Sequence, residues 1–150
     1  MAYTPFGYCA LTAIGIGIQG FLDAMQTVNL REELGLPYPD DGNGRMGVKL
    51  NDTEWKRFAS YNTVHKLSMD YLPITTTMLL IGGIHYPIVS TVLGVVYIAG
   101  RQIFSIGYRA SGPEGRYNGN AILKIAVLGL FVTSATSCLK MLDVIELNGY

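Results

Sequence analysis

Four long apolar stretches, separated by polar and turn-forming segments, dominate the chain. They cover about residues 6–28, 53–83, 88–110 and 121–142. Each is long enough, at about 1.5 Å per helical residue, to cross the roughly 30 Å hydrocarbon core of a bilayer. The pattern therefore predicts an all-α membrane protein, with residues 1–150 forming a single four-helix antiparallel transmembrane bundle.

Capping and turn residues place the ends of these predicted helices. Residues 29–57 are polar and contain two prolines and the turn-rich segment DDGNG, so they form the longest loop. Asn51 or Thr53 is expected to cap the second helix, and Pro73 to kink it. The very short link over residues 84–87 predicts that the second and third helices form an antiparallel hairpin.

Three glycines in the first stretch match the pattern G-x-G-x-x-G over residues 15–20. A nucleotide-binding loop with this pattern needs a strand before it and a helix after it. Here the glycines lie within one apolar run. The small pairs Ala13/Gly17 and Gly20/Ala24 are four residues apart, which lets a neighbouring helix approach closely. Helix packing is therefore the favoured interpretation.

The composition supports a membrane protein. Hydrophobic residues make up 49% of the chain and charged residues 15%, whereas about 25% is usual in soluble domains. The formal net charge is zero, so no nucleic-acid partner is indicated. Cys9 and Cys138 form no metal or redox motif, and phosphate-binding loops, zinc spacings and hydrolase motifs are missing from the sequence.

Basic residues gather around two of the three connections. Residues 29–57 and 109–119 face the same side of a four-helix bundle. By the positive-inside rule this side faces the cytosol, or the matrix if the membrane is the mitochondrial inner membrane. The endoplasmic reticulum and the mitochondrial inner membrane both remain open. The basic residues concerned are Arg31, Arg45, Lys49, Lys56, Arg57, Arg109 and Arg116.

The second helix carries several ionisable groups, at residues 58–73, just before it becomes apolar. Such groups at the mouth of a membrane helix are costly and need a physical reason. His65 and Lys66 could polarise a substrate. The favoured alternative is that Lys66 and Asp70, four residues apart, pair on the helix surface while His65 faces the membrane interface.

Two charged residues interrupt the apolar stretches themselves. Asp23, near the end of the first stretch, is expected to lie at the interface or to find a partner within the bundle rather than to act in catalysis. Arg101, within the third stretch, needs a partner if it is buried. That partner is either a carboxylate of a bound ligand or Asp70, in an ion pair that holds the second and third helices together.

Several segments, taken in order, resemble one family of membrane proteins. They are Leu36–Pro39, Phe58–Pro73, Gly82–Pro87, Leu93–Arg101 and the pair Gly107-Tyr108. This set resembles the membrane-associated proteins in eicosanoid and glutathione metabolism (MAPEG). Within the family, the microsomal glutathione transferase 3 type is the most similar, and His65 matches a histidine of that type.

The resemblance implies a homotrimer of four-helix bundles that binds glutathione between subunits and delivers its thiolate to lipophilic electrophiles or hydroperoxides. A nearby cation lowers the pKa of the thiol, and arginine matches the carboxylates of the tripeptide. If the chain is active, the thiol-activating arginine is Arg116, one residue from the expected position at Gly115. The resemblance places the other glutathione contacts at Arg31, His65, Asp70, Arg101 and Tyr108.

The glutathione motif departs from that of active members. Counting back from Pro73, the family motif has glutamate, asparagine and arginine, whereas this chain has Asp70, Leu67 and Thr63. Phe104 stands where many active members have tyrosine. Threonine and aspartate at these positions are also expected from the 5-lipoxygenase-activating protein, which is regarded as a non-enzymatic lipid-binding scaffold.

Three functions follow from these residues. The favoured one is a catalytically degenerate family member, not an enzyme, that serves as a structural or accessory subunit of a larger membrane complex. The first alternative is an active glutathione transferase or lipid peroxidase, which would use glutathione as its cofactor. The second is a non-enzymatic lipid-binding scaffold. Each implies contact with membrane lipids, and none implies a metal.

Overall fold

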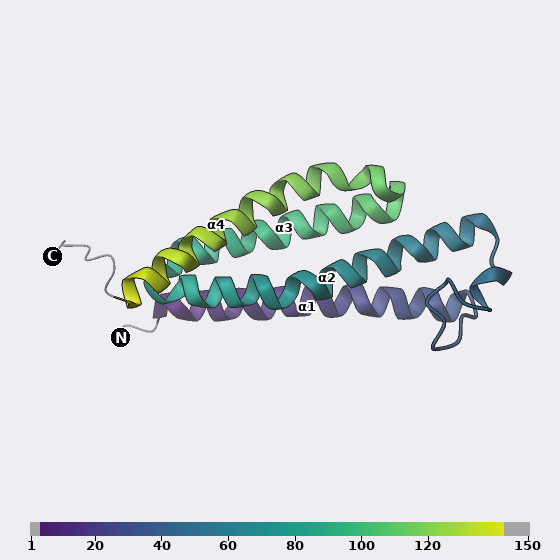
Figure 1. The fold of residues 1–150 in the computed structure, drawn as a ribbon, viewed down its shortest axis with the longest axis horizontal. Helices are drawn as coiled ribbons and strands as arrows, with labels where there is room; N and C mark the ends of the chain where they lie inside the picture. Colours follow the sequence, from purple (N-terminus) through teal and green to yellow (C-terminus); the bar gives the residue numbers. More distant parts are fainter. Residues whose placement is uncertain (1–3, 143–150) are drawn as a thin grey trace.

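The computed structural model describes residues 4–142. In Figure 1 four long helices lie lengthwise, with α1 beside α2 and α3 beside α4. The loop after α1 and the turn after α3 lie at one end, and the link between α2 and α3 lies at the other. The elements in order are α1 (Thr4–Glu33), η1 (Gly47–Lys49), α2 (Asp52–His85), α3 (Pro87–Ser111), η2 (Gly112–Arg116) and α4 (Tyr117–Met141).

The predicted all-α bundle is confirmed, but two helix ends differ from the prediction. α1 continues to Glu33 instead of ending at Val28, and α4 begins at Tyr117 instead of residue 121. One side of the extra turn of α1 is buried, because Leu30 packs against Phe58 near the start of α2, whereas Glu32 and Glu33 are exposed. Packing therefore extends the helix past the point where its sequence becomes polar.

Three helical runs are long and apolar enough to cross a membrane. They are Pro5–Glu33, Asp52–His85 and Pro87–Met141, of 29, 34 and 55 residues. The last run combines α3, η2 and α4, which fold back on one another as antiparallel limbs (Figure 1). The three apolar runs thus form four rods, as the sequence predicted.

The N-terminus of α2 and the proline inside this helix agree with the prediction from the sequence. The Glu54 amide donates to Asn51 Oδ1 at 2.9 Å, and the Asn51 amide donates to Glu54 Oε2 at 3.1 Å. This reciprocal capping box satisfies two amides that the first turn leaves free. Pro73 lies inside the helix, which continues to His85 and bends along its length (Figure 1).

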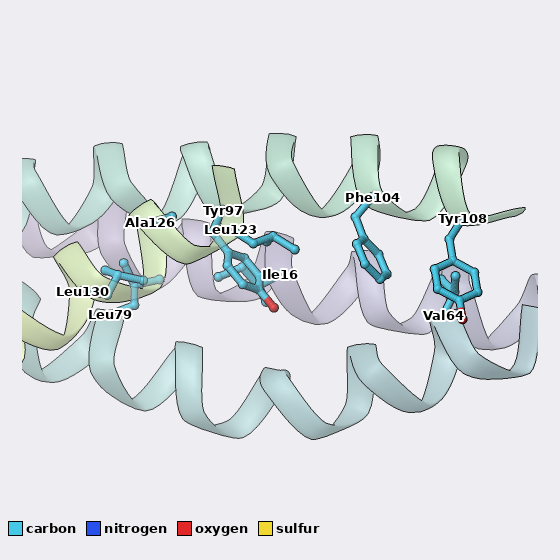
Figure 2. Packing of buried hydrophobic residues seen from close by; sticks show 9 residues of the cluster. All are labelled: Ile16, Val64, Leu79, Tyr97, Phe104, Tyr108, Leu123, Ala126 and Leu130. Carbon is cyan, nitrogen blue, oxygen red and sulfur yellow. The ribbon is translucent and has the colours of Figure 1, made fainter. Parts of the chain in front are cut away.

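Side chains from all four helices meet along the axis of the bundle (Figure 2). The outward faces are also apolar; Leu11 is 66% and Phe21 62% exposed. Exposed apolar surface of this extent suits contact with lipid tails rather than water. The buried cluster in Figure 2 comprises Ile16, Val64, Leu79, Tyr97, Phe104, Tyr108, Leu123, Ala126 and Leu130.

Glycines bring the backbones of the last two limbs into contact. A Cβ atom on Gly107 would lie 2.1 Å from the carbonyl oxygen of Gly115, and one on Gly119 would lie 2.3 Å from the amide nitrogen of Phe104. Because the clashing atoms belong to the backbone, no side-chain movement relieves them. The turn at η2 and the first turn of α4 are therefore held tightly against α3.

The glycines of α1 differ in how closely other side chains approach them. They all lie inside α1, which excludes a nucleotide-binding loop at residues 15–20. A Cβ on Gly20 would approach the Met69 methyl group at 2.9 Å, so this position does allow close packing of α1 against α2. Gly17 has no atom within 4 Å of its Cβ position, so it does not pack closely against another helix of the same chain.

Candidate functional site

A cavity of about 520 Å³ lies between α2, α3 and the first half of α4. Its volume falls within the range usual for small-molecule sites, about 300–1,000 Å³. Most of its wall is apolar, and the polar groups come chiefly from α3, η2 and the start of α4. The lining residues are Leu67, Tyr71, Met78, Tyr97, Arg101, Phe104, Arg116, Asn120, Leu123, Lys124, Val127, Leu128 and Phe131.

Three cationic side chains share this cavity. Arg101 comes from α3, Arg116 from the turn η2, and Lys124 from α4, with the amide of Asn120 between the last two along the chain. None of the described lining residues is acidic. The cavity is therefore suited to an anionic group, which arginine can bind through two parallel hydrogen bonds. Of the residues that the sequence singled out, Arg101 and Arg116 are brought together here.

The Arg101 guanidinium is buried and held mainly by α2. Its Nε and Nη2 donate to Ser68 Oγ at 3.1 and 2.7 Å, and Nη2 also donates to the Val64 carbonyl at 2.7 Å. The group lies 4.9 Å from the centre of the Phe104 ring. Nη1 forms no hydrogen bond with any described residue.

Asp23 of α1 anchors this arrangement. Its Oδ2 accepts from Ser68 Oγ at 2.5 Å, and its Oδ1 accepts from Arg109 Nη2 at 2.5 Å. Arg109 Nη1 donates in turn to Gln26 Oε1 at 2.5 Å. One buried carboxylate thus serves two guanidinium groups of α3, one directly and one through a serine. The prediction that Asp23 has a partner within the bundle is confirmed.

The predicted ion pairs of Asp70 are wrong. Asp70 is exposed on α2, and Arg101 instead reaches a carboxylate through Ser68. Lys66 does not pair with Asp70 either; its Nζ lies 3.1 Å from Asp41 Oδ2, in the loop after α1. Spacing along one helix identified neighbours, but the partners come from other elements.

At two positions, the cavity lining carries an apolar side chain where the family resemblance expects a hydrogen-bonding group. Leu67 and Phe104 both line it, and the family resemblance expects an amide and a phenol there. The third altered position, Thr63, lies outside the cavity, in a groove that Tyr108 also lines. The Tyr108 ring packs 5.6 Å from that of Phe104 and is 9% exposed. The cavity is therefore poorer in hydrogen-bonding groups than the resemblance implies.

Arg31 lies away from the cavity, at the end of α1. It donates to the carbonyl of Asp40 and lies 3.5 Å from Asp41 Oδ1. Its guanidinium is sandwiched 4.4 Å from the Tyr38 ring and 5.2 Å from the Phe58 ring. Within one chain, this arginine is engaged in holding the loop after α1 rather than in lining a binding site.

That loop is organised around the Asp40 carboxylate. Oδ1 accepts from the amides of Gly42 and Gly44 at 2.8 and 2.9 Å, and Oδ2 from those of Met46 and Gly47 at 2.7 and 3.2 Å. Desolvation acts to raise the pKa of Asp40, but the four amide donors outweigh it and hold the pKa below its ordinary value of 3.8.

His65 also lies outside the cavity. It is half-buried on α2, and its Nδ1 is buried with no hydrogen-bond partner among residues 4–142. Sequence reasoning missed Ser68, Asn120 and Lys124. Lys124 could have been found, because a charge early in an apolar helix needs a partner or a water-filled space. Ser68 and Asn120 carry no such signal.

Together, the long apolar helices, their outward apolar faces and the cation-lined cavity between helices define an integral membrane protein of the helix-bundle class. The model of the MAPEG family matches residues 9–136, which span all four helices. The chain therefore belongs to the MAPEG family.

Proposed function

We propose that this MAPEG protein has weak or no glutathione chemistry and serves as a structural or accessory subunit of a larger membrane complex. The observation that carries the proposal is the lining of the cavity by Leu67 and Phe104, where family resemblance expects an amide and a phenol. The bundle and its buried polar network need neither group, so the fold is retained without them.

The cost of these replacements is large enough to matter. A polar group of a ligand that is buried without a hydrogen-bond partner costs about 1–3 kcal/mol. Glutathione is a peptide with several such groups. Losing two partners therefore weakens binding by a factor of about 30 or more, at 1.4 kcal/mol for each factor of ten.

Finer assignments belong to the same proposal. His65 supports the microsomal glutathione transferase 3 type as the most similar branch. Family membership suggests a homotrimer surrounded by membrane lipids. The basic connections at residues 29–57 and 109–119 support an orientation toward the cytosol or the matrix, in the endoplasmic reticulum or the mitochondrial inner membrane.

Calorimetry with glutathione and native mass determination on the detergent-purified protein test the main proposal. We expect no heat of binding up to millimolar glutathione, no turnover of a standard electrophile, and co-purification of the chain in an assembly larger than a trimer. Micromolar or low-millimolar binding to an isolated trimer, accompanied by turnover, would contradict the accessory role.

An active glutathione transferase or lipid peroxidase is the second candidate. It is favoured by one observation, the meeting of Arg101, Arg116 and Lys124 around one cavity. Arg116 would lower the pKa of the glutathione thiol, and the other two cations would hold carboxylates. Arg116→Ala would then abolish turnover, whereas Arg45→Ala, which removes an exposed cation from the loop after α1, would leave it unchanged.

A lipid-binding scaffold is the third candidate. Much of the cavity wall is apolar, with Met78, Val127, Leu128 and Phe131 contributing to it. Saturable binding of a fatty acid, together with no thiol chemistry, would favour this function over the other two.

A further inference from the structure

A second groove, of about 680 Å³, lies between the first turns of α2 and the end of α3. It shares no lining residue with the cavity described above, but two of its lining residues, Thr63 and Tyr108, stand at positions that the family resemblance assigns to glutathione. Its wall combines basic, hydroxyl and small apolar side chains. The lining residues are Trp55, Lys56, Arg57, Ala59, Ser60, Thr63, Tyr108, Arg109, Ala110, Ser111, Gly112 and Pro113.

Basic side chains line the groove. Lys56, Arg57 and Arg109 contribute to its wall, none of its described lining residues is acidic, and Arg109 is paired with Asp23 of α1. Arg57 forms an ion pair with Glu33 at 2.7 Å, but both side chains are about half exposed. An exposed pair of this kind contributes little and is readily shared with another anion. Lys56 has no ion-pair partner among residues 4–142.

Arg109, in the wall of the groove, retains one nitrogen without a hydrogen-bond partner. The Arg109 side chain is 10% exposed, and its Nε is buried with no hydrogen-bond partner among the described residues. The hydroxyl-bearing side chains of Thr63, Tyr108 and Ser111 line the same space. A phosphate group has several strong acceptor oxygens, which suit hydroxyl and guanidinium donors together.

The groove lies where lipid headgroups would be. In Figure 1 α2 extends beyond the end of α3, which stops at Ser111. The groove is lined by residues at this end of α3 and by the early turns of α2. Trp55 stands in its wall, 41% exposed, with its indole nitrogen donating to the Gly42 carbonyl at 2.9 Å. Tryptophan is enriched at the boundary between hydrocarbon and headgroups.

We propose that this groove binds the phosphate of an anionic phospholipid headgroup. Basic pockets between transmembrane helices on the positively charged side are suited to such headgroups. Lys56 and Arg57 contact the phosphate from α2, and the hydroxyl groups near the end of α3 complete the site. The acyl chains extend from the groove into the bilayer, along the apolar outer faces of the helices.

Trp55 provides the test, because it is the only tryptophan in the chain and lies in the groove wall. Its fluorescence is followed while the detergent-purified protein is titrated with phosphatidylglycerol, phosphatidylcholine or inorganic phosphate. We expect a saturable change with phosphatidylglycerol and little change with the other two. An equal response to phosphatidylcholine, or saturation by inorganic phosphate alone, would overturn the proposal.

Charge variants locate the site. Lys56→Gln combined with Arg57→Gln should weaken phosphatidylglycerol binding about thirtyfold, because each cation near an anionic lipid contributes a factor of about five. Glu33→Gln releases Arg57 from its partner and should strengthen binding severalfold. The matched control, Arg45→Gln with Lys49→Gln, removes the same charge from the nearby loop. Equal weakening by the control would mean non-specific attraction and would also overturn the proposal.

Discussion

Asp23 shows how one side chain stabilises the whole polar interior. Its carboxylate accepts a hydrogen bond from Ser68 and one from Arg109, and Ser68 in turn accepts from Arg101. Two cations of α3 thus depend on one anion of α1. The arrangement leaves net positive charge in the bundle, next to a cavity lined by two more cations.

Replacing this carboxylate should therefore destabilise the fold strongly. Asp23→Asn leaves Arg109 without its buried counter-charge, and breaking a buried pair typically costs about 3–5 kcal/mol. Glu33→Gln, which breaks the exposed pair with Arg57, should cost less than about 1 kcal/mol. Unfolding in detergent micelles compares the two variants. Equal effects would show that Asp23 does not anchor the network.

Leu67 and Phe104 offer a test of the proposed function. Leu67→Asn and Phe104→Tyr add hydrogen-bonding groups to the cavity wall. Each new hydrogen bond is worth about 0.5–1.5 kcal/mol, so glutathione affinity should rise about two- to tenfold per substitution. Calorimetry measures the change, with Leu128→Asn on the same wall as the control. A gain equal to that of the control would show that these two positions have no specific role in glutathione binding.

At the level of elements, the contact between α3 and α4 depends on missing side chains. Gly119→Ala would place a Cβ atom 2.3 Å from a backbone nitrogen, so the two helices must separate. We expect a loss of at least about 2 kcal/mol, by the mechanism of an overpacked core. Gly17→Ala meets no atom and should be neutral or stabilising by up to about 1 kcal/mol. Thermal unfolding distinguishes the two; similar shifts would contradict the close approach.

The loop after α1 should respond to acid through Asp40. Its pKa is lowered in the folded protein, so its contribution to stability is present above the ordinary value of 3.8 and is lost as the pH falls below it. Trp55 reports on the loop, because its indole bonds to Gly42. We expect its emission to stay constant from pH 7 to about 4 and then to change. Asp40→Asn should alter the emission at pH 7; the same acid transition in this variant would assign it to another group.

Sequence reasoning succeeded where local chemistry decides the outcome. The capping group of Asn51 and the lone charge of Asp23 each act through neighbours or through a general cost, and each was predicted. It failed for the partners of Arg101 and Lys66. Those partners belong to other elements, and their approach depends on how the helices pack, which spacing along one helix does not encode.

In the candidate site, too, the sequence placed some residues correctly and others wrongly. Arg101 and Arg116 were identified from resemblance, and they do share a cavity. Arg31 was identified in the same way, but in this chain its side chain is enclosed by Tyr38 and Phe58. The enclosing loop follows no regular period, so its path over the arginine could not be derived from the pattern of polar and apolar residues.

For the whole molecule, the arrangement of the ends predicts a topology. The loop after α1 and the turn η2 lie at one end of the bundle, and the link between α2 and α3 lies at the other (Figure 1). Cysteines introduced at Lys49 and Glu114, in a Cys9→Ser and Cys138→Ser background, should react with an impermeant maleimide from the same side of sealed vesicles. A cysteine at His85 should react only from the opposite side. Labelling of Lys49→Cys and Glu114→Cys from different sides would contradict the four-rod arrangement.

The residues of the buried polar network are also synthesised in a particular order. Both guanidinium groups belong to α3, whereas Asp23 and Ser68 belong to helices that the ribosome completes earlier. An arginine that enters the centre of a bilayer alone costs about 2.5–3.5 kcal/mol. Here its counter-charge is already in place when α3 arrives. A circularly permuted chain that began with α3 would present two cations to lipid before any carboxylate had been made to receive them.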